Sequence, residues 1–164
     1  MAKTIMIVAF AAAFLLAFYF APRYTGEQRA AAELPPGSRF ELEQPISLPA
    51  HDRAIYFQAG RQVRQREIDS LAYSCEMELE KPAAQAREVS AGSLTVRAVS
   101  KTEQYQSPDQ MLREDRFEVD PSPADLPLRR IVCRGWTQGS SVGAFSIADL
   151  KTALDPYFGV LIAD

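Results

Sequence analysis

Cys75 and Cys133 are the residues whose chemistry is most constrained by type and position. Each lies on the apolar face of a strand-like segment, and two cysteines in an exported domain most economically form one disulfide. Closing a loop of about 60 residues would stabilise the fold by roughly 4 kcal/mol in the chain-entropy model. Two alternatives stay open, free buried thiols and a reactive cysteine with His51 as its base. The cysteines form no Cys-x-x-Cys pair, and His51 has no evident orienting partner.

Six arginines form two local clusters. The first contains Arg61, Arg64 and Arg66, and the second contains Arg129, Arg130 and Arg134. If the clusters meet in the fold, they would form a site for an anionic ligand or a lipid headgroup, because the planar guanidinium suits phosphate and carboxylate. The alternative is two solvated surfaces whose charge is offset by neighbouring acids. The sequence favours the solvated surfaces and leaves the anion site as a hypothesis.

Glu76, Glu78 and Glu80 alternate along one segment and would share a strand face, about 6.5–7 Å apart. This spacing is wide for one shared cation, so a solvated face is favoured over a calcium or acid–base site. One histidine and two cysteines cannot supply four nitrogen or sulfur ligands to zinc. No phosphate-binding Gly-Lys-Ser/Thr loop occurs. The sequence therefore predicts no metal, no cofactor and no catalytic residue.

Residues 5–21 form an uncharged apolar run between Lys3 and Pro22. As a helix the run would rise roughly 25 Å, near the lower limit for spanning a bilayer. An uncleaved anchor is favoured over a signal peptide, because the run exceeds a signal core and Tyr19 occupies a position where cleavage requires a small residue. Lys3, with no acid before the run, favours a cytoplasmic N-terminus. We therefore expect a single-pass inner-membrane protein with a periplasmic C-terminal domain; a soluble periplasmic product after cleavage is the alternative.

The rest of the chain divides into a tether and one domain. Residues 22–37 are polar or small and end in Pro35, Pro36 and Gly37, which is typical of a flexible tether. Residues 38–164 are then enough for one globular domain. Nine phenylalanines, six tyrosines and one tryptophan argue against disorder. A net charge of −3 gives no reason to expect nucleic acid as a partner.

Short segments of alternating polarity predict a mainly antiparallel sheet. Leu71–Glu80 is the clearest, with apolar residues on one face and acids on the other. The other expected strands are Arg39–Leu42, Arg53–Gln58 with a turn at Ala59–Gly60, Ser93–Val99, Arg116–Val119, Arg129–Trp136 and a final strand through Phe158 and Ile162. Residues 61–70 are ambiguous between strand and helix. We expect about five to seven strands.

Two helices are expected beside these strands. Ser107 precedes Pro108 as an N-cap and predicts a short helix over Pro108–Glu114. Ser146 begins a second helix, with Asp149 completing a capping box and Pro156 following its end. The predicted fold class is α+β, a small, mainly antiparallel β domain with one or two short helices, preceded by an N-terminal membrane helix.

Three segments carry a resemblance to a known group of proteins. They are Ala54–Gly60, then Tyr73–Leu79 with Ile68–Asp69 before it, and Ile131–Trp136. Together they resemble an uncharacterised family of exported, membrane-anchored gammaproteobacterial proteins, in which a tyrosine–aromatic–glutamine strand precedes a cysteine-bearing strand. The resemblance covers residues 50–155. It implies an envelope location and a paired cysteine framework, and it supplies no activity or binding residue.

These features favour a membrane-tethered periplasmic accessory or interaction module without catalysis of its own. A flexible tether of about 16 residues spans roughly 20–25 Å on average, so we expect a protein partner in or near the inner membrane. The first alternative is a periplasmic binder of a small anionic ligand or lipid headgroup, using the arginine clusters. The second is a thiol-dependent enzyme.

Overall fold

The computed structural model describes residues 34–107, 110–123, 126–138 and 146–163, which form two antiparallel sheets and a short helix. The larger sheet has eight strands in the order β10-β1-β7-β8-β9-β5-β3-β4, and the smaller pairs β2 with β6. The elements are β1 (Arg39–Leu42), β2 (Ile46–Leu48), β3 (Ala54–Gln58), β4 (Arg61–Val63), the 3₁₀ helix η2 (Gln65–Glu67), β5 (Ser74–Leu79), β6 (Arg87–Val89), β7 (Ser93–Ser107), β8 (Gln110–Ser122), β9 (Leu128–Gln138), α2 (Ile147–Leu154) and β10 (Phe158–Leu161). The predicted β-rich domain is confirmed, and every strand expected from the sequence is present. The ten strands of the described residues exceed the expected five to seven, because β2, β4 and β6 have only three residues each and show no periodic pattern.

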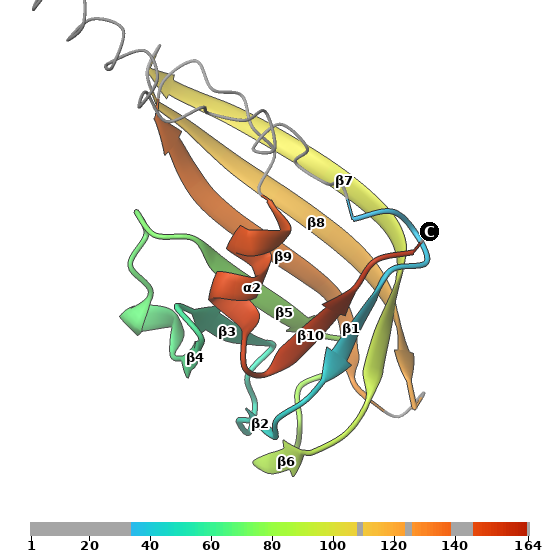
Figure 1. Ribbon diagram of the computed structural model, residues 1–164. Helices are drawn as coiled ribbons and strands as arrows, with labels where there is room; N and C mark the ends of the chain where they lie inside the picture. Colours follow the sequence, from blue (N-terminus) through green and yellow to red (C-terminus); the bar gives the residue numbers. More distant parts are fainter. Residues whose placement is uncertain (1–33, 108–109, 124–125, 139–145, 164) are drawn as a thin grey trace, which may run out of the picture.

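The eight-stranded sheet curves into a half-barrel, and α2 lies across its concave side (Figure 1). The helix contacts β10 at one end of the sheet and β3 and β5 toward the other. Phe57 of β3 lies with its ring centroid 5.3 Å from that of Tyr157 and 5.8 Å from that of Phe158. Because β3 and β10 stand near opposite edges of the sheet, the helix and these rings close its open side. The core lies between α2 and the concave face.

Helix α2 follows from a local sequence signal. The Ser146 hydroxyl accepts a hydrogen bond from the Asp149 N–H at 3.2 Å, and the Asp149 carboxylate accepts one from the Ser146 N–H at 2.7 Å. This reciprocal capping box satisfies N–H groups that a helix leaves unpaired at its start. Leu150 and Leu154 are buried against the sheet. The predicted helix, its cap and its end before Pro156 are confirmed.

The β3–β4 hairpin has a two-residue turn that rests against the end of α2. Ala59 and Gly60 both adopt positive φ, at 50° and 69°, as the hairpin turns that match strand twist require. The Gly60 N–H donates to the Ala153 carbonyl at 3.3 Å. A Cβ atom at Gly60 would lie 2.5 Å from the Asp155 carbonyl oxygen, so this approach requires glycine. The predicted turn is confirmed.

The helix expected over Pro108–Glu114 is wrong. Residues 110–114 belong to β8, and residues 108 and 109 lie outside the described residues. Alternate residues of β8 are buried, namely Met111, Arg113, Asp115, Phe117 and Val119. Arg113 donates through Nε to the Asp115 carboxylate at 3.1 Å, and burial raises the pKa of Asp115 although Arg113 partly offsets it. Because this charged pair lies on the buried face, the first half of β8 does not alternate between apolar and polar residues, and the sequence pattern does not indicate a strand there.

The last residues of the segment expected to be a tether pack against the domain. Leu34 is 3% exposed and belongs to the core, and the Gly37 N–H donates to the Val96 carbonyl at 2.7 Å. The expected membrane helix over residues 5–21, and the tether up to residue 33, lie outside the described residues. In the described part of the chain, no helix has the length and apolar character needed to cross a membrane.

Candidate functional site

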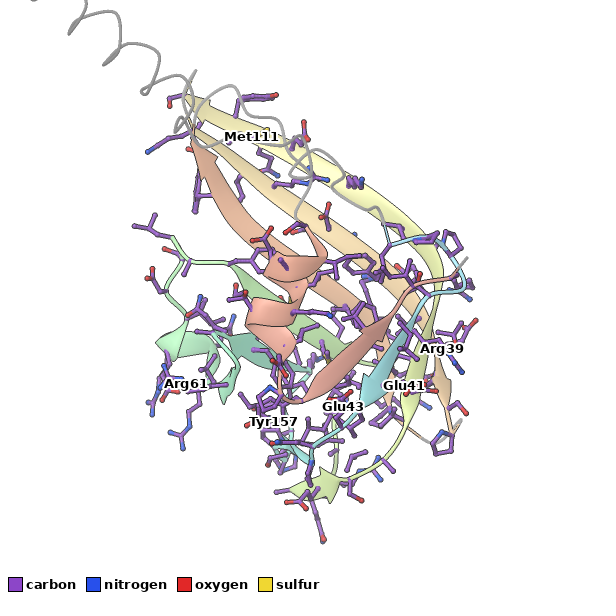
Figure 2. The ribbon with its side chains drawn as sticks, in the orientation of Figure 1. Arg39, Glu41, Glu43, Arg61, Met111 and Tyr157 are labelled. Carbon is purple, nitrogen blue, oxygen red and sulfur yellow. A yellow bond between two sulfur atoms is a disulfide. The ribbon has the colours of Figure 1, made fainter. Side chains whose placement is uncertain are left out.

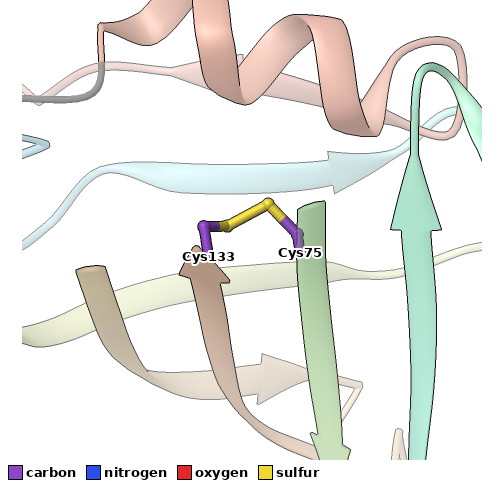
Figure 3. Close-up of a disulfide and its surroundings, with 2 residues drawn as sticks. All are labelled: Cys75 and Cys133. Carbon is purple, nitrogen blue, oxygen red and sulfur yellow. A yellow bond between two sulfur atoms is a disulfide. The ribbon is translucent and has the colours of Figure 1, made fainter. Parts of the chain in front are cut away.

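Cys75 and Cys133 form a disulfide between neighbouring strands of the sheet (Figure 3). The β5–β9 register places them directly opposite each other, with their Cα atoms 4.0 Å apart and an S–S bond of 2.07 Å. Both are buried on the concave face, at 1% and 0% exposure. The predicted pairing is confirmed, and neither sulfur is a free thiol. His51, the suggested base, is exposed in the turn before β3.

The second arginine cluster is paired with glutamates on the outer face of the sheet, the face turned away from α2. Arg134 of β9 donates to Glu114 at 2.7 Å and to Glu76 at 2.9 Å. Its neighbours repeat this pattern: Arg130 donates to Glu118 at 2.6 Å and to Glu78 at 3.2 Å, Arg129 to Glu78 at 2.9 Å, and Arg116 to Glu114 at 2.7 Å. Four arginines and four glutamates from β5, β8 and β9 therefore form two neighbouring clusters, each of two arginines and two glutamates and without net charge, called together the outer charge network.

Hydrogen bonds favour the charged forms of Glu114 and Arg134 in this network. Burial opposes ionisation of Glu114, but hydrogen bonds from Arg134 and Arg116 outweigh it and lower the pKa of this carboxyl. Burial likewise disfavours the charged form of Arg134, and its bonds to Glu114 and Glu76 outweigh it and raise its pKa. Val132 lies between Glu76 and Arg116 in the register and is 1% exposed. The long charged side chains thus also cover an apolar residue on the outer face.

An open groove of about 1260 Å³ adjoins this network beside β3 and β4. Its lining comes from the segment before β3, from β3 and β4, from η2 and from the outward side chains of β5. Arg64 and Arg66 of the first predicted cluster line this groove together with Arg129 of the second. Arg61, Arg130 and Arg134 are not among its lining residues. Figure 2 shows Arg61 at the outer edge of the hairpin. The structure therefore brings the two predicted clusters together only in part.

The groove carries both signs of charge. The arginines in its lining are Arg53, Arg64, Arg66 and Arg129, and the acids are Asp52, Glu67, Glu76, Glu78 and Glu80. Arg129 is held by Glu78, whereas Arg53, Arg64 and Arg66 form no ion pair within the described residues. Tyr56 lines the groove, and burial, with the nearby Glu76 carboxylate, raises the pKa of its hydroxyl. Such a lining suits a polar chain with both charges better than a small anion alone.

Comparison with protein-family models, with curated proteins and with solved structures finds no match to this chain. The resemblance to exported gammaproteobacterial proteins stays a prediction.

Sequence reasoning missed the residues that give the groove its shape. Gln62 of β4 accepts from the Ser47 N–H at 3.0 Å through its side-chain oxygen and donates to the Ser47 carbonyl, which ties β4 to β2. Arg53 and Tyr56 also went unnoticed as lining residues. The alternation of Arg53–Gln58 does place Tyr56 on the face of the strand away from the buried Phe57. The groove, however, also depends on η2 and on β5, which is distant in the sequence. In the described ranges no group of three metal-ligating side chains occurs.

Proposed function

We propose that this chain is a membrane-tethered periplasmic interaction module, without catalysis of its own, that binds a polar segment of a protein partner in the groove beside β4. The observation that carries the proposal is the open groove itself, whose lining mixes arginines and acids. Small-molecule sites are usually enclosed, largely apolar and about 300–1,000 Å³ in volume. A larger, open and charged groove suits a peptide segment that presents both a basic and an acidic side chain.

Two further observations support the location. Disulfides such as Cys75–Cys133 form and persist in oxidising compartments, and the periplasm is one of them. The apolar run over residues 5–21 has the composition of a membrane anchor. A domain held close to the membrane by a short linker would meet partners that are themselves in or near that membrane.

Site-specific cross-linking in cells tests the proposal. A photoreactive residue is placed in the full chain at Arg64 or at Glu80, both exposed in the groove lining, or at Ser90, which is exposed outside it. We expect the same neighbour to be captured from Arg64 and Glu80 and not from Ser90. The double variant Arg64→Glu, Arg66→Glu should reduce capture from Glu80, because it reverses the charge beside the bound segment. Arg87→Glu, an exposed arginine on β6 without an ion pair among the described residues, is the matched control.

Equal capture from Ser90, or capture from Glu80 that charge reversal leaves unchanged, would contradict the proposal.

A second candidate is a binder of an anionic ligand or lipid headgroup. The observation that favours it is that Arg53, Arg64 and Arg66 line one groove without an ion-pair partner in the described segments. Titration of the full chain, in neutral detergent, with inorganic phosphate and with glycerol phosphate tests this candidate. Binding should fall steeply with salt and in Arg64→Glu. Affinity that responds to neither change would exclude it.

The thiol-enzyme alternative would require the Cys75–Cys133 bond to open, and activity that persists in a Cys75→Ser, Cys133→Ser variant would exclude it.

A further inference from the structure

Within the described residues, the outer half of β7 is a sheet edge without a partner strand. Strand β7 pairs with β8 along its length, but its pairing with β1 covers only Ser93–Thr95, and the Val96 backbone bonds to Gly37 and Ser38 end that contact. Figure 1 shows β7 as the outermost of the three long strands beyond the end of β1. No other described strand pairs with this edge from Arg97 to Ser107, and residues 100–106 are all exposed.

This edge carries few of the devices that usually prevent strand-to-strand association. Proteins protect open edges with proline, short strands, bulges or charged side chains, and between Ala98 and Tyr105 the charged side chains are Lys101 and Glu103, one of each sign. Register shifts occur between Val96 and Ala98 and between Tyr105 and Ser107, so the stretch between them is regular, and it contains no proline. Tyr105 is 65% exposed at its end. A long regular edge with an exposed aromatic ring is a surface for another strand.

We propose that this edge pairs antiparallel with the same edge of a second copy of the chain, around a two-fold axis at Thr102. In this register Thr102 faces Thr102 of the partner subunit. Lys101 faces Glu103 of the partner subunit, and Val99 faces Tyr105 of the partner subunit, with each pair occurring twice. Opposite charges and aromatic–β-branched contacts are the cross-strand pairs that stabilise antiparallel sheets.

The charges already present inside one subunit continue across this contact. Lys101 stands opposite Asp115 of β8, and Glu103 stands opposite Arg113. Adding the second copy gives a row from Asp115 through Lys101 to Glu103 of the partner subunit and then to its Arg113. Signs alternate along the whole row. The same row runs in the other direction, so four strands carry an uninterrupted alternation of charge.

Neighbouring two-fold registers lack this match. A two-residue shift in one direction places Lys101 against Lys101 of the partner subunit, and in the other it places Glu103 against Glu103 of the partner subunit. A one-residue shift exchanges the two faces of the strand, because side chains alternate along it. Charge complementarity therefore specifies both the occupant, a second copy, and its register.

Cysteine cross-linking of the full chain in membranes tests the register. Residues directly opposite in an antiparallel pair have Cα atoms about 4.5–5.5 Å apart, within reach of a disulfide. Thr102→Cys should form a disulfide-linked dimer under mild oxidation, whereas Gln104→Cys on the same face should not. Mixing Ser100→Cys with Gln104→Cys should give a cross-linked heterodimer. The native cysteines are buried and already paired, so they do not compete.

Charge variants give an independent measurement of the same contact. Glu103→Lys or Lys101→Glu alone should weaken self-association in detergent about tenfold, because each places like charges in opposition. The two variants mixed together, and the double variant Lys101→Glu, Glu103→Lys, should recover it. A monomer at all concentrations, or cross-linking of Gln104→Cys that equals that of Thr102→Cys, would overturn the proposal.

Discussion

Arg134 shows how the role of a charged residue is set by its neighbours across the sheet. Its guanidinium bridges Glu114 on one side and Glu76 on the other, so its charge is balanced within the outer charge network. Arg130 is held in the same way. The sequence shows that these arginines are close to Arg129, but their partners come from β5 and β8. Their pairing could not be predicted because it depends on long-range register.

Glu114→Gln tests the network at the residue scale. Because Arg134 and Arg116 lower the pKa of Glu114 in the folded state, its contribution to stability is present above the usual carboxyl pKa and is lost as pH falls through the folded value. We expect the variant to lose about 1–2 kcal/mol in free energy of unfolding at pH 7. This difference should shrink below about pH 4. Urea unfolding followed by circular dichroism at several pH values measures it.

Glu88→Gln is the control, since Glu88 is exposed on β6 and forms no ion pair among the described residues. A loss in Glu114→Gln that stays constant from pH 7 to pH 3 would contradict the electrostatic account.

Gly60→Ala tests the contact between the β3–β4 turn and α2. The new methyl group would meet the Asp155 carbonyl oxygen at 2.5 Å, at a residue with φ of +69°. We expect a loss of about 2–4 kcal/mol in unfolding free energy, from strain and from displacement of the turn. Gly37→Ala has a positive φ but meets Ala163 at an ordinary 3.4 Å, and should lose only about 1 kcal/mol. Thermal unfolding of both variants measures which one loses more stability. Equal losses would show that the contact with the Asp155 carbonyl oxygen does not determine the cost.

At the scale of elements, a helix or strand could be predicted where its own residues determine it, and could not be predicted where neighbouring strands determine it. The α2 cap lies within Ser146–Asp149, and the sequence located it correctly. β8 becomes a strand because β7 and β9 flank it, and the cap-like Ser107–Pro108–Asp109 misled the prediction. β2 and β6 have three residues each, too short for a periodic pattern, and were missed.

Ser146→Ala tests the start of α2. Removing the hydroxyl takes away one of the two acceptors of the Asp149 N–H, which also donates to the Ser146 carbonyl at 3.0 Å, and losses of about 0.5–2 kcal/mol are usual for such caps. We expect a loss near 1 kcal/mol, measured by chemical unfolding. Ser90→Ala, at an exposed position between β6 and β7, should leave the stability unchanged. If both variants behave alike, the cap does not support the helix.

At the scale of the whole molecule, stability depends on closing the open side of the half-barrel. Phe57 is fully buried and contacts Tyr157 and Phe158 from the opposite end of the sheet. Phe57→Ala should therefore cost about 3–5 kcal/mol in unfolding free energy, by lost burial and by the cavity that it leaves. Leu71→Ala, at a 75% exposed position, should cost less than about 0.5 kcal/mol. Urea unfolding distinguishes the two, and a small loss in Phe57→Ala would show that the ring contacts do not hold the ends together.

Strands β1 and β10 pair with each other although they are the first and last strands of the sheet in chain order. A ribosome therefore delivers β1 early and its partner only at the end of synthesis, and α2 comes just before that partner. Until then Phe57 lacks the Tyr157 and Phe158 rings that contact it, so stepwise folding of the growing chain would leave this part of the core exposed. A stop codon ahead of Phe158 leaves α2 in the chain but removes the strand that pairs with β1 and one of the two rings that contact Phe57. Quality control would treat such a product as unfolded protein, not as a slightly shortened one.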